Sequence, residues 1–454
     1  MQMAFLMTDG TLLTQSFSNN TWYRYAPDAS GGYQDGTWTQ AATLPAGYAP
    51  SAFASAVLAD DRFLISGGEY NYPGNYNLQL TNKGAVYDPK ANTWTPIGHP
   101  KTWHWIGDSP ASVLPDGRFL VGQKLTRQDA VIDPKTLTWT MLGDTGKSDH
   151  NAEEGWTLLP DGTILTADVK NAPNSERYNP ATGQWTSQGS TGPDLHSPSP
   201  YKYCLTYGPK PKDCYLPPGE IGPAILRPDG TVFATGSGSG PSGGGVGHTA
   251  IYTPSGSGGT WKAGPDFPGG DNAGDSFAAL LPSGNVLVLG VSGTLYEFNG
   301  TSFTTTGNGF NQTPMLLLPT GQVLLLGYSS VYLYTPSGQA QSSWLPTITK
   351  APSTVTRGKT YAISGTQFNG LSQAMSFGDE YQNATNYPLV RITNKSTGHI
   401  FYARTHDHSS MGVATGSLSV STNFDVPSNA ETGASTLEVV ANGNASLAVS
   451  VTVK

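Results

Sequence analysis

Short apolar runs alternate with tight polar turns along most of the chain, and one arrangement recurs seven times. Two apolar runs flank a turn at residues 4–15, 55–68, 111–122, 156–167, 224–236, 278–290 and 315–327. Asp-Gly, Ser-Gly or Thr-Gly at most of these turns supplies the positive φ that a two-residue hairpin turn needs. The pattern therefore predicts seven β-hairpins.

Two further strands are expected after most hairpins. The third ends in Tyr or Ile before Asp-Pro, Asn-Pro or Thr-Pro, and the fourth carries an aromatic residue. These aromatic residues are Trp38, Trp94, Trp139, Trp185, Trp261 and Phe303. Seven four-stranded units predict an all-β fold, a seven-bladed kelch-type β-propeller over residues 1–345, with the aromatic residues wedged between blades.

The repeat stops after Trp344. Residues 346–454 keep alternating strands without the repeat, which predicts an immunoglobulin-like β-sandwich as a second domain. The chain begins directly on the inner strand of the first blade. We therefore expect either that residues before Met1 have been lost or that the segment around Trp344 closes the ring unaided, without an N-terminal strand in the seventh blade.

Composition narrows the function and the location. Only 12% of the 454 residues are charged and the net charge is −8, which argues against binding nucleic acid. No run of eighteen apolar residues exists, so no membrane span is expected.

Cys204 and Cys214 lie in one loop, where a local disulfide of a secreted protein is expected; two free thiols or half of a metal site are the alternatives. No signal peptide is visible, and we expect a monomer.

Seven such blades followed by a small sandwich resemble the galactose oxidase and glyoxal oxidase family of secreted copper-radical enzymes. The likeness covers the paired strands of 316–327, the segment 346–364, the Thr-His of ARTHDHSS and FDVPS at 424–428. In that family a loop of the C-terminal domain carries a histidine up the propeller axis to the copper. The resemblance implies this role for His406, with His408 as the next choice.

The remaining copper-radical residues do not match. The resemblance implies a cysteine in the second blade, a crosslinked tyrosine in the third and a Tyr-His pair in the seventh. This chain has Ala52, Asp108 and Asn311-Gln312 there. Without an oxidisable phenol and its thioether, alcohol oxidation lacks a second redox centre, so a copper-radical cofactor is not expected.

Carboxylates are expected at the mouth of the channel instead. Eight or nine residues before each hairpin turn, the blades place Ala52, Asp108, Glu153, Ile221 beside Glu220, Asp275, and Gln312 beside Asn311. Carboxylates converging on one axis need a cation or a proton. With His406 and His408, the residues Asp108, Glu153 and Asp275 predict a site for Ca²⁺, Mg²⁺ or Mn²⁺, or for Zn²⁺ or iron.

Simpler roles remain open for every one of these residues. Asp and Glu near Gly or Ser often cap loops, and both histidines could bond across the domain interface. Trp103, Trp105, Trp156 and Phe310 lie in loops near the mouth and could stack on sugar rings, but such aromatic residues are also common core wedges.

Three functions fit these predictions. The first is a secreted module that binds a glycan or another extracellular small molecule at the axial face, through Trp103, Trp105, Trp156, Asn311 and Gln312 and with or without a divalent metal. The second is an enzyme in which Asp108, Glu153 and His406 act on a polysaccharide as hydrolase or lyase, or as a non-radical oxidoreductase. The third is a structural scaffold with an empty site.

Overall fold

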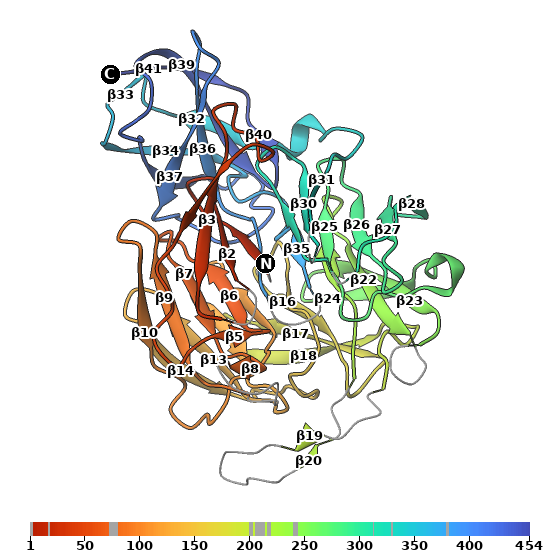
Figure 1. The fold of residues 1–454 in the computed structure, drawn as a ribbon. Coiled ribbons are helices and arrows are strands. Elements are labelled where there is room, and N and C mark those ends of the chain that lie inside the picture. Colours follow the sequence, from red (N-terminus) through yellow and green to blue (C-terminus); the bar gives the residue numbers. More distant parts are fainter. Residues whose placement is uncertain are drawn as a thin grey trace.

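Seven small antiparallel sheets surround a central axis, and a further sheet caps one end of the ring (Figure 1). The computed structural model describes residues 3–16, 19–71, 80–198, 203–204, 214–215, 219–238, 244–311, 313–327, 330–377 and 381–454, with the backbone alone at 203–204 and 214–215. The predicted all-β fold is confirmed: a seven-bladed β-propeller precedes a curled sheet consistent with a β-sandwich. The kelch and immunoglobulin-like subtypes and the boundary at residue 346 stay predictions.

Blades 1 to 4 each contain four strands that run outward from the axis. Blade 1 comprises β1 (Ala4–Leu6), β2 (Leu12–Gln15), β3 (Trp22–Ala26) and β4 (Thr37–Gln40). Blade 2 comprises β6 (Ala54–Val57), β7 (Phe63–Ser66), β9 (Gly84–Asp88) and β10 (Thr93–Ile97), with β5 (Pro50–Ser51) paired to β8 (Tyr70–Asn71) beside it. Blade 3 comprises β11 (Ala111–Val113), β12 (Phe119–Gly122), β13 (Asp129–Asp133) and β14 (Thr138–Gly143). Blade 4 comprises β15 (Thr157–Leu158), β16 (Ile164–Ala167), β17 (Asn174–Asn179) and β18 (Gln184–Ser190).

Blades 5 and 6 repeat the four-stranded pattern, whereas blade 7 has three described strands. Blade 5 comprises β21 (Ala224–Leu226), β22 (Val232–Gly238), β23 (Gly247–Ser255) and β24 (Gly258–Ala263). Blade 6 comprises β25 (Ala278–Leu280), β26 (Val286–Leu289), β27 (Leu295–Phe298) and β28 (Phe303–Gly307), preceded by the 3₁₀ turn η2 (Pro268–Gly270). Blade 7 has three described strands, β29 (Met315–Leu317), β30 (Val323–Leu326) and β31 (Val331–Tyr334).

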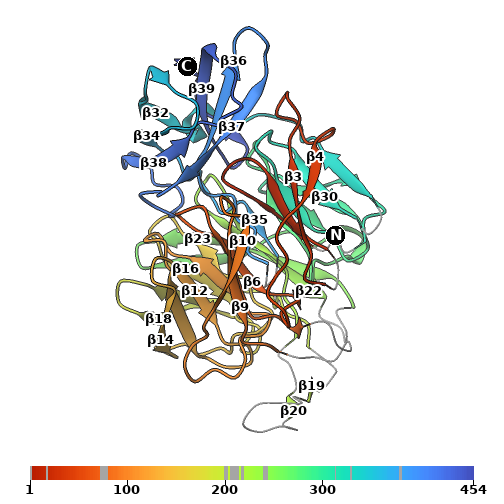
Figure 2. The same ribbon diagram turned by 60° about the vertical axis from the view of Figure 1, so that its left-hand side comes forward.

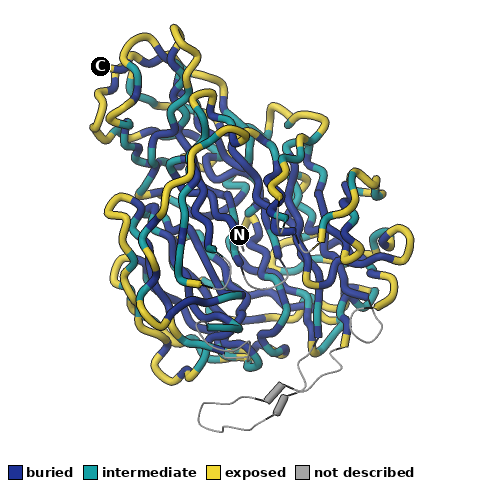
Figure 3. Tube along the Cα trace, in the orientation of Figure 1, coloured by how far each residue is buried: buried dark blue, intermediate teal, exposed yellow. Residues whose placement is uncertain are grey.

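The inner hairpins are buried and the outer strands face solvent, as Figure 3 shows. Every residue of β6, β7 and β12 is buried, whereas all four residues of β4 are exposed. The turn glycines take the expected positive φ, as at Gly10 and Gly117 with 75° and 88°. The seven predicted hairpins are therefore confirmed.

Indole rings on the outer strands tie neighbouring blades together. Each bonds with its Nε1–H to the preceding blade: Trp94 to Ala42 O at 3.0 Å, Trp139 to Gly98 O at 2.6 Å, Trp185 to Asp129 Oδ2 at 2.7 Å, and Trp261 to Ser175 Oγ at 2.8 Å. In blade 6 the ring of Phe303 meets Phe233 of blade 5 edge-on, with 6.0 Å between the ring centres. The predicted wedge role is thus confirmed for these residues, but not for Trp38, which is 44% exposed.

The C-terminal region forms one curled sheet on the side of the ring where the hairpin turns lie (Figure 2). Its strands are β32 (Thr347–Lys350), β33 (Thr354–Val355), β34 (Thr360–Thr366), β36 (Leu389–Asn394), β37 (Ile400–His406), β38 (Val420–Asp425), β39 (Gly433–Ala441), β40 (Asn444–Ala445) and β41 (Val449–Val453). A separate apolar core that includes Phe368, Val390, Phe424 and Leu437 lies within it.

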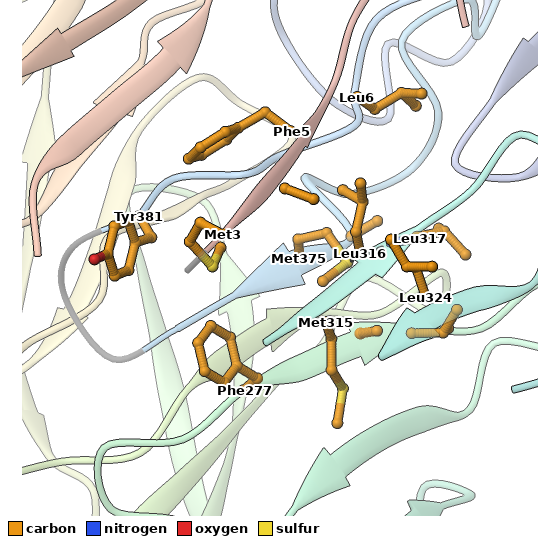
Figure 4. Packing of buried hydrophobic residues seen from close by; sticks show 14 of the residues in the cluster. Met3, Phe5, Leu6, Phe277, Met315, Leu316, Leu317, Leu324, Met375 and Tyr381 are labelled. Carbon is orange, nitrogen blue, oxygen red and sulfur yellow. Dashed lines mark hydrogen bonds between the residues drawn. The ribbon is translucent and has the colours of Figure 1, made fainter. Parts of the chain in front are cut away.

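A loop of this region enters the propeller and fills the channel. We call its described residues, 373–377 and 381–387, the axial loop. Its strand β35 (Met375–Ser376) pairs with β25 as a fifth strand of blade 6. Figure 4 shows Met375 and Tyr381 packed among Met3, Phe5, Phe277 and Met315 around the axis.

The axial loop also bonds to the inner hairpin, or to the residues leading into it, of every blade. Its hydrogen-bond partners are Leu6 in blade 1, Phe53 in blade 2, Ser112 in blade 3, Leu158 in blade 4, Ala224 in blade 5, Leu280 in blade 6 and Met315 in blade 7. Because one segment contacts all seven blades, it holds the ring together from the centre.

This arrangement bears on how the ring closes. No N-terminal strand lies in blade 7 among the described residues, since β1 is the innermost strand of blade 1. The segment around Trp344 does not close the ring either: it forms the 3₁₀ turn η3 (Ser342–Trp344), and its indole lies under Gly284 of blade 6. Of the two alternatives expected above, closure by the segment around Trp344 was therefore wrong, and the other alternative stays a prediction.

Two other expectations concern the periphery. The backbones of β19 (Tyr203–Cys204) and β20 (Cys214–Tyr215) pair Cys204 with Cys214. The side chains of both lie outside the described part of the chain, so the disulfide stays a prediction. No helix in the described residues combines the length and the apolar character needed to cross a bilayer.

Candidate site at the channel mouth

At the end of the channel that lies away from the C-terminal sheet, two carboxylates from neighbouring blades contact the same lysine side chain. Lys124 Nζ donates to Asp108 Oδ2 at 2.6 Å and also contacts Glu153 Oε1. The Lys124 and Asp108 side chains are 5% and 4% exposed, while that of Glu153 is 20% exposed. An ammonium group thus lies where the sequence predicted a cation, and Glu153 is the member that reaches solvent.

The local backbone explains how Lys124 reaches this position. Lys124 follows β12, and its N–H donates to Ile106 O at 3.0 Å. Gly107 has φ of 84°, and a Cβ there would lie 2.8 Å from Lys124 Cβ. Glycine is therefore needed at 107 both for its backbone conformation and for the close approach of the lysine. Trp105, which is half-buried, donates from Nε1 to Lys124 O at 2.9 Å.

Backbone contacts join the mouth segments of consecutive blades. Leu125 N–H donates to Asn151 O at 2.7 Å, linking blade 3 to blade 4. Glu153 forms an isolated parallel bridge with Glu220, linking blade 4 to blade 5. Counting back from the hairpin turns therefore located residues that do lie together, although Asp275 of blade 6 is an exposed residue with φ of 50°.

The two histidines lie at the opposite end of the propeller. His408 N–H donates to Ala59 O at the hairpin turn of blade 2, and Met411 N–H donates to Pro115 O at the turn of blade 3. The extended chain from Asp108 to Pro115 covers about 20 Å. The predicted convergence of His406 and His408 with Asp108, Glu153 and Asp275 was wrong, and with it the proposed catalytic and metal-binding sets that combine them. The cause is that the Thr-His pair belongs to strand β37 and not to the axial loop.

At that end His406 takes part in an interface network. Its Nδ1 lies 2.7 Å from Asp407 Oδ2 and its Nε2 lies 3.3 Å from Asp425 Oδ1. Arg404 joins Asp425, at 2.7 Å, to Asp61 of the blade 2 turn. Burial acts to raise the pKa of Asp425, but hydrogen bonds from Thr360, Arg404 and His406 outweigh it and lower the pKa to about 2.

His408 is held neutral in the same interface. Its Nδ1 lies 2.9 Å from Thr422 Oγ1, and its ring stacks parallel to Tyr387 at 6.4 Å. Burial and, secondarily, the charge of His406 lower the pKa of His408 to about 3. Both histidine side chains therefore bond within the C-terminal region, and of the two residues only His408 bonds across the interface in the described part of the chain, through its backbone N–H to Ala59 O.

A tyrosine occupies the axial position that the resemblance assigned to a histidine. Ala52 N–H donates to the Tyr381 hydroxyl at 2.6 Å, and Tyr381 N–H donates to Phe53 O at 2.9 Å. The Tyr381 ring meets Phe53 edge-on at 4.9 Å. Tyr381 of the axial loop therefore lies beside the position where the family's cysteine was expected.

The predicted ligand-binding residues divide into three groups. Trp103 and Trp156 are buried in the walls, where Trp156 packs on Trp185 at 5.5 Å, so the stacking role expected for them was wrong. Trp105 is half-buried and Asn311 is exposed, so their roles stay predictions. Gln312 lies outside the described residues.

A second ion cluster lies in the wall between blades 3 and 4. Lys147 Nζ lies 2.9 Å from Glu154 Oε1, 3.6 Å from Glu176 Oε2 and 4.2 Å from the centre of the Trp185 ring. Desolvation acts to lower the pKa of Lys147, but the nearby carboxylates outweigh it and raise that pKa. This cluster is closed to solvent, since Lys147 and Glu154 side chains are both 0% exposed.

Sequence reasoning missed Lys124, Lys147 and Tyr381. Lys124 follows the second strand of a hairpin, which ends on the face where the first strand begins. Counting past the second strand as well as before the first would have found it. Lys147 and Tyr381 lie in loops without a repeat signal, so no pattern in the chain marks them.

Comparisons with known proteins agree on the fold. Neither the models of protein families nor the curated protein sequences give a match. Among solved structures, a fungal alcohol oxidase of the AA5 family in complex with copper has a TM-score of 0.54 at 16% identity, covering 99% of this chain and 96% of that one. The fold is therefore galactose oxidase-like, and at this identity the likeness carries no activity.

Two other solved structures are more remote. The streptogramin B lyase has a TM-score of 0.49 at 12% identity, covering 73% of this chain and 94% of that one. The extracellular domain of a one-component system from B. thetaiotaomicron has a TM-score of 0.49 at 11% identity, covering 100% of this chain and 55% of that one.

The described residues at the mouth do not fit a copper-radical centre. Ala52 offers no ligand, Asp108 is held by Lys124, and a tyrosine takes the axial position. Within the described part of the chain no three His, Cys, Asp or Glu residues are grouped so that they could hold a metal ion.

Proposed function

We propose that the protein binds a hydroxyl-rich ligand, in the first place an extracellular glycan, at the channel mouth between Glu153 and Trp105. The supporting observation is the shared ammonium of Lys124, which contacts two carboxylates from different blades and fixes the orientation of Glu153. A fixed carboxylate accepts hydrogen bonds from sugar hydroxyls, and a neighbouring indole ring offers an apolar face to a sugar.

The same arrangement favours binding over hydrolysis by the paired carboxylates. A glycosidase needs its scissile bond between the two carboxyl groups. Here Asp108 and Glu153 contact one nitrogen, and the Asp108 side chain is 4% exposed. No substrate atom can enter between them while Lys124 remains in place.

Binding to a soluble oligosaccharide panel, measured by calorimetry, tests the proposal. We expect Glu153→Gln to weaken binding at least tenfold, because the amide keeps the shape but loses the charge. Asp116→Asn is the matched control: it lies in the neighbouring blade 3 at the opposite end, with its side chain 53% exposed, and should change nothing. A panel without any binder, or equal binding by both variants, would count against the mouth as a glycan site.

Chelation separates the role of Lys124 from that of a divalent metal. After dialysis against EDTA we expect binding to persist, since the Lys124 ammonium already occupies the place between Asp108 and Glu153 that a metal would take. Loss of binding that Ca²⁺, Mg²⁺, Mn²⁺ or Zn²⁺ restores would instead support the metal-assisted form predicted from the sequence. Incubation of a bound oligosaccharide followed by mass spectrometry reports any cleavage, and so tests the enzymatic alternative.

A further inference from the structure

Basic side chains gather at one side of the channel mouth, although the chain as a whole has a net charge of −8. Arg127 lies in the loop between β12 and β13, and Lys170 lies in the loop between β16 and β17 of the next blade. The Arg127 side chain is 47% exposed, and Lys170 is exposed as well. With His150, which lies in the β14–β15 loop, they form a group that we call the basic rim.

Main-chain contacts bring the three loops of the basic rim together. Asn151 N–H donates at 2.6 Å to the carbonyl oxygen of the residue before Arg127. Lys170 N–H donates to Asp149 Oδ2 at 3.2 Å. Asp149 and Asn151 are the chain neighbours of His150. The loops that carry the two cations therefore both meet the chain beside the histidine.

His150 is the uncharged member of the basic rim. Lys170 Nζ lies 3.1 Å from His150 Nδ1. Burial lowers the pKa of His150, and the charges of Lys170 and Arg127 lower it further. The ring is therefore neutral at neutral pH, accepts the ammonium N–H at Nδ1 and keeps its own proton on Nε2. The basic rim thus presents guanidinium, ammonium and imidazole N–H donors near one another.

Carboxylates beside the basic rim leave its charge accessible. Arg127 Nη2 lies 3.8 Å from Asp144 Oδ2, and the Asp144 side chain is 52% exposed. An exposed ion pair of this length contributes little to stability. Asp149 is buried and accepts the main-chain N–H groups of residues 169–171 at 2.7 to 3.2 Å. In the described part of the chain, no strong ion pair therefore has to be broken for a ligand to reach the two cations.

The basic rim lies within reach of a ligand that bonds Glu153. His150 and Glu153 are three residues apart in one loop, so their Cα atoms lie within about 11 Å. Lys124, which contacts Glu153, is likewise three residues from Arg127. A short oligosaccharide whose hydroxyls bond Glu153 can therefore place an acid group on Arg127 or Lys170.

We propose that the glycan bound at the mouth is anionic: a sugar carboxylate or sulfate lies on Arg127 and Lys170 while neighbouring hydroxyls bond Glu153. This inference rests on the proposed function and adds the substrate class to it. A guanidinium donates two parallel N–H bonds to an acid group, and an ammonium adds a compact charge beside it. The net negative charge of the chain repels a polyanion elsewhere on the surface, so the basic rim also orients the ligand.

Matched ligands test the charge of the glycan. Oligosaccharides of galacturonic, glucuronic and mannuronic acid are each compared with their own methyl esters, and sulfated galactan oligosaccharides are compared with the desulfated forms. We expect calorimetry to show at least tenfold tighter binding of the acid form in at least one pair, and added salt should reduce that difference because it screens the charges. The pair that responds distinguishes a carboxylate from a sulfate.

The outcomes separate this inference from the glycan site itself. Equal affinity of the acid and neutral forms in every pair that binds overturns the anionic class, while the glycan site stands. A panel in which neither form of any pair binds counts against the glycan site, and the inference fails with it.

Protein variants locate the contact. Arg127→Gln and Lys170→Gln should each weaken binding of the acid form at least fivefold and leave the neutral form unchanged, because they remove a charge and keep a donor. Glu153→Gln should weaken both forms. Lys135→Gln is the matched control, since Lys135 is exposed and lies between β13 and β14 at the opposite end of blade 3. Unchanged affinity for the acid form in both rim variants overturns the inference, whatever the result for Glu153→Gln.

Discussion

Glu153 and Glu154 are adjacent in the chain, yet each pairs with a different lysine in a different environment. Glu153 turns to the channel mouth and Lys124, with 20% of its side chain exposed. Glu154 turns into the wall and Lys147, with none exposed. Both lysines pair with two carboxylates, so the two clusters differ in access to water: the cluster at the mouth is open to the ligand that we propose, and the cluster in the wall is closed.

The buried cluster should show the largest effect when it is broken. Lys147→Met leaves Glu154 and Glu176 without their cation, and removing one partner of a buried pair costs about 3–5 kcal/mol. Urea unfolding at neutral pH measures the loss. Lys147→Met combined with Glu154→Gln should recover part of it, because a neutral amide does not depend on the lost cation. A loss below about 1 kcal/mol would mean that water reaches the cluster.

Raising the pH from 7 to 9 should lower the stability of the protein through buried carboxyl groups in and around this cluster. Burial raises the pKa of Asp129 to about 7, that of Glu154 to about 8 and that of Asp168 to about 9. These carboxyls titrate near 4 when unfolded, so the folded state binds more protons between these values. Their contribution to stability is complete below about pH 4 and is lost as the pH rises through 7 to 9.

Asp168 provides the sharpest check on this pH dependence. Glu176, Asp149 and Glu154 add to the effect of burial there, whereas Lys147 opposes it. Asp168→Asn imitates the protonated carboxyl and should flatten the fall in the urea midpoint between pH 7 and 9. Asp266→Asn, at a side chain that is 57% exposed, should leave the profile as it is. If the urea midpoint of Asp168→Asn falls between pH 7 and 9 as in the unmodified protein, other groups cause the loss of stability at alkaline pH.

Breaking the cluster at the mouth should cost less. Lys124→Met keeps the stem and removes the charge, but water can reach Glu153 and replace part of the ion pair. We expect a loss of about 1–3 kcal/mol, below that of Lys147→Met in the same urea assay. Equal losses in the two variants would remove the distinction between an accessible and a structural cluster.

The sequence repeat made the fold predictable. The parts of the candidate site that lie in segments without the repeat were harder to predict. Hairpins recur with the same turn chemistry, so strand positions and the mouth residues Asp108 and Glu153 follow from counting along each blade. His406 was misplaced because a Thr-His pair in a β-rich stretch looks the same whether it lies in an axial loop or in a sheet strand. The segment that enters the channel, around Met375 and Tyr381, has no periodic signal.

The lysines show a second limit. From the sequence alone, a lysine in a β-propeller is expected to be exposed to solvent, because burying an unpaired ammonium group costs free energy. Lys124 pairs with Asp108 of its own blade and Glu153 of the next, and Lys147 pairs with Glu154, seven residues on, and with Glu176. The sequence does not show which of the nearby carboxylates turn toward each lysine, because that depends on how the loops between blades fold.

Glu153→Gln should have the smallest effect on stability and so separates function from fold most cleanly. Lys124 keeps Asp108 at 2.6 Å as its partner, and the new amide remains partly exposed, so the unfolding free energy should change by less than about 1 kcal/mol. Ligand affinity should nevertheless fall at least tenfold, because the charged acceptor is gone. A stability loss close to that of Lys147→Met would place Glu153 with the structural cluster. Water access would then no longer distinguish the two glutamates.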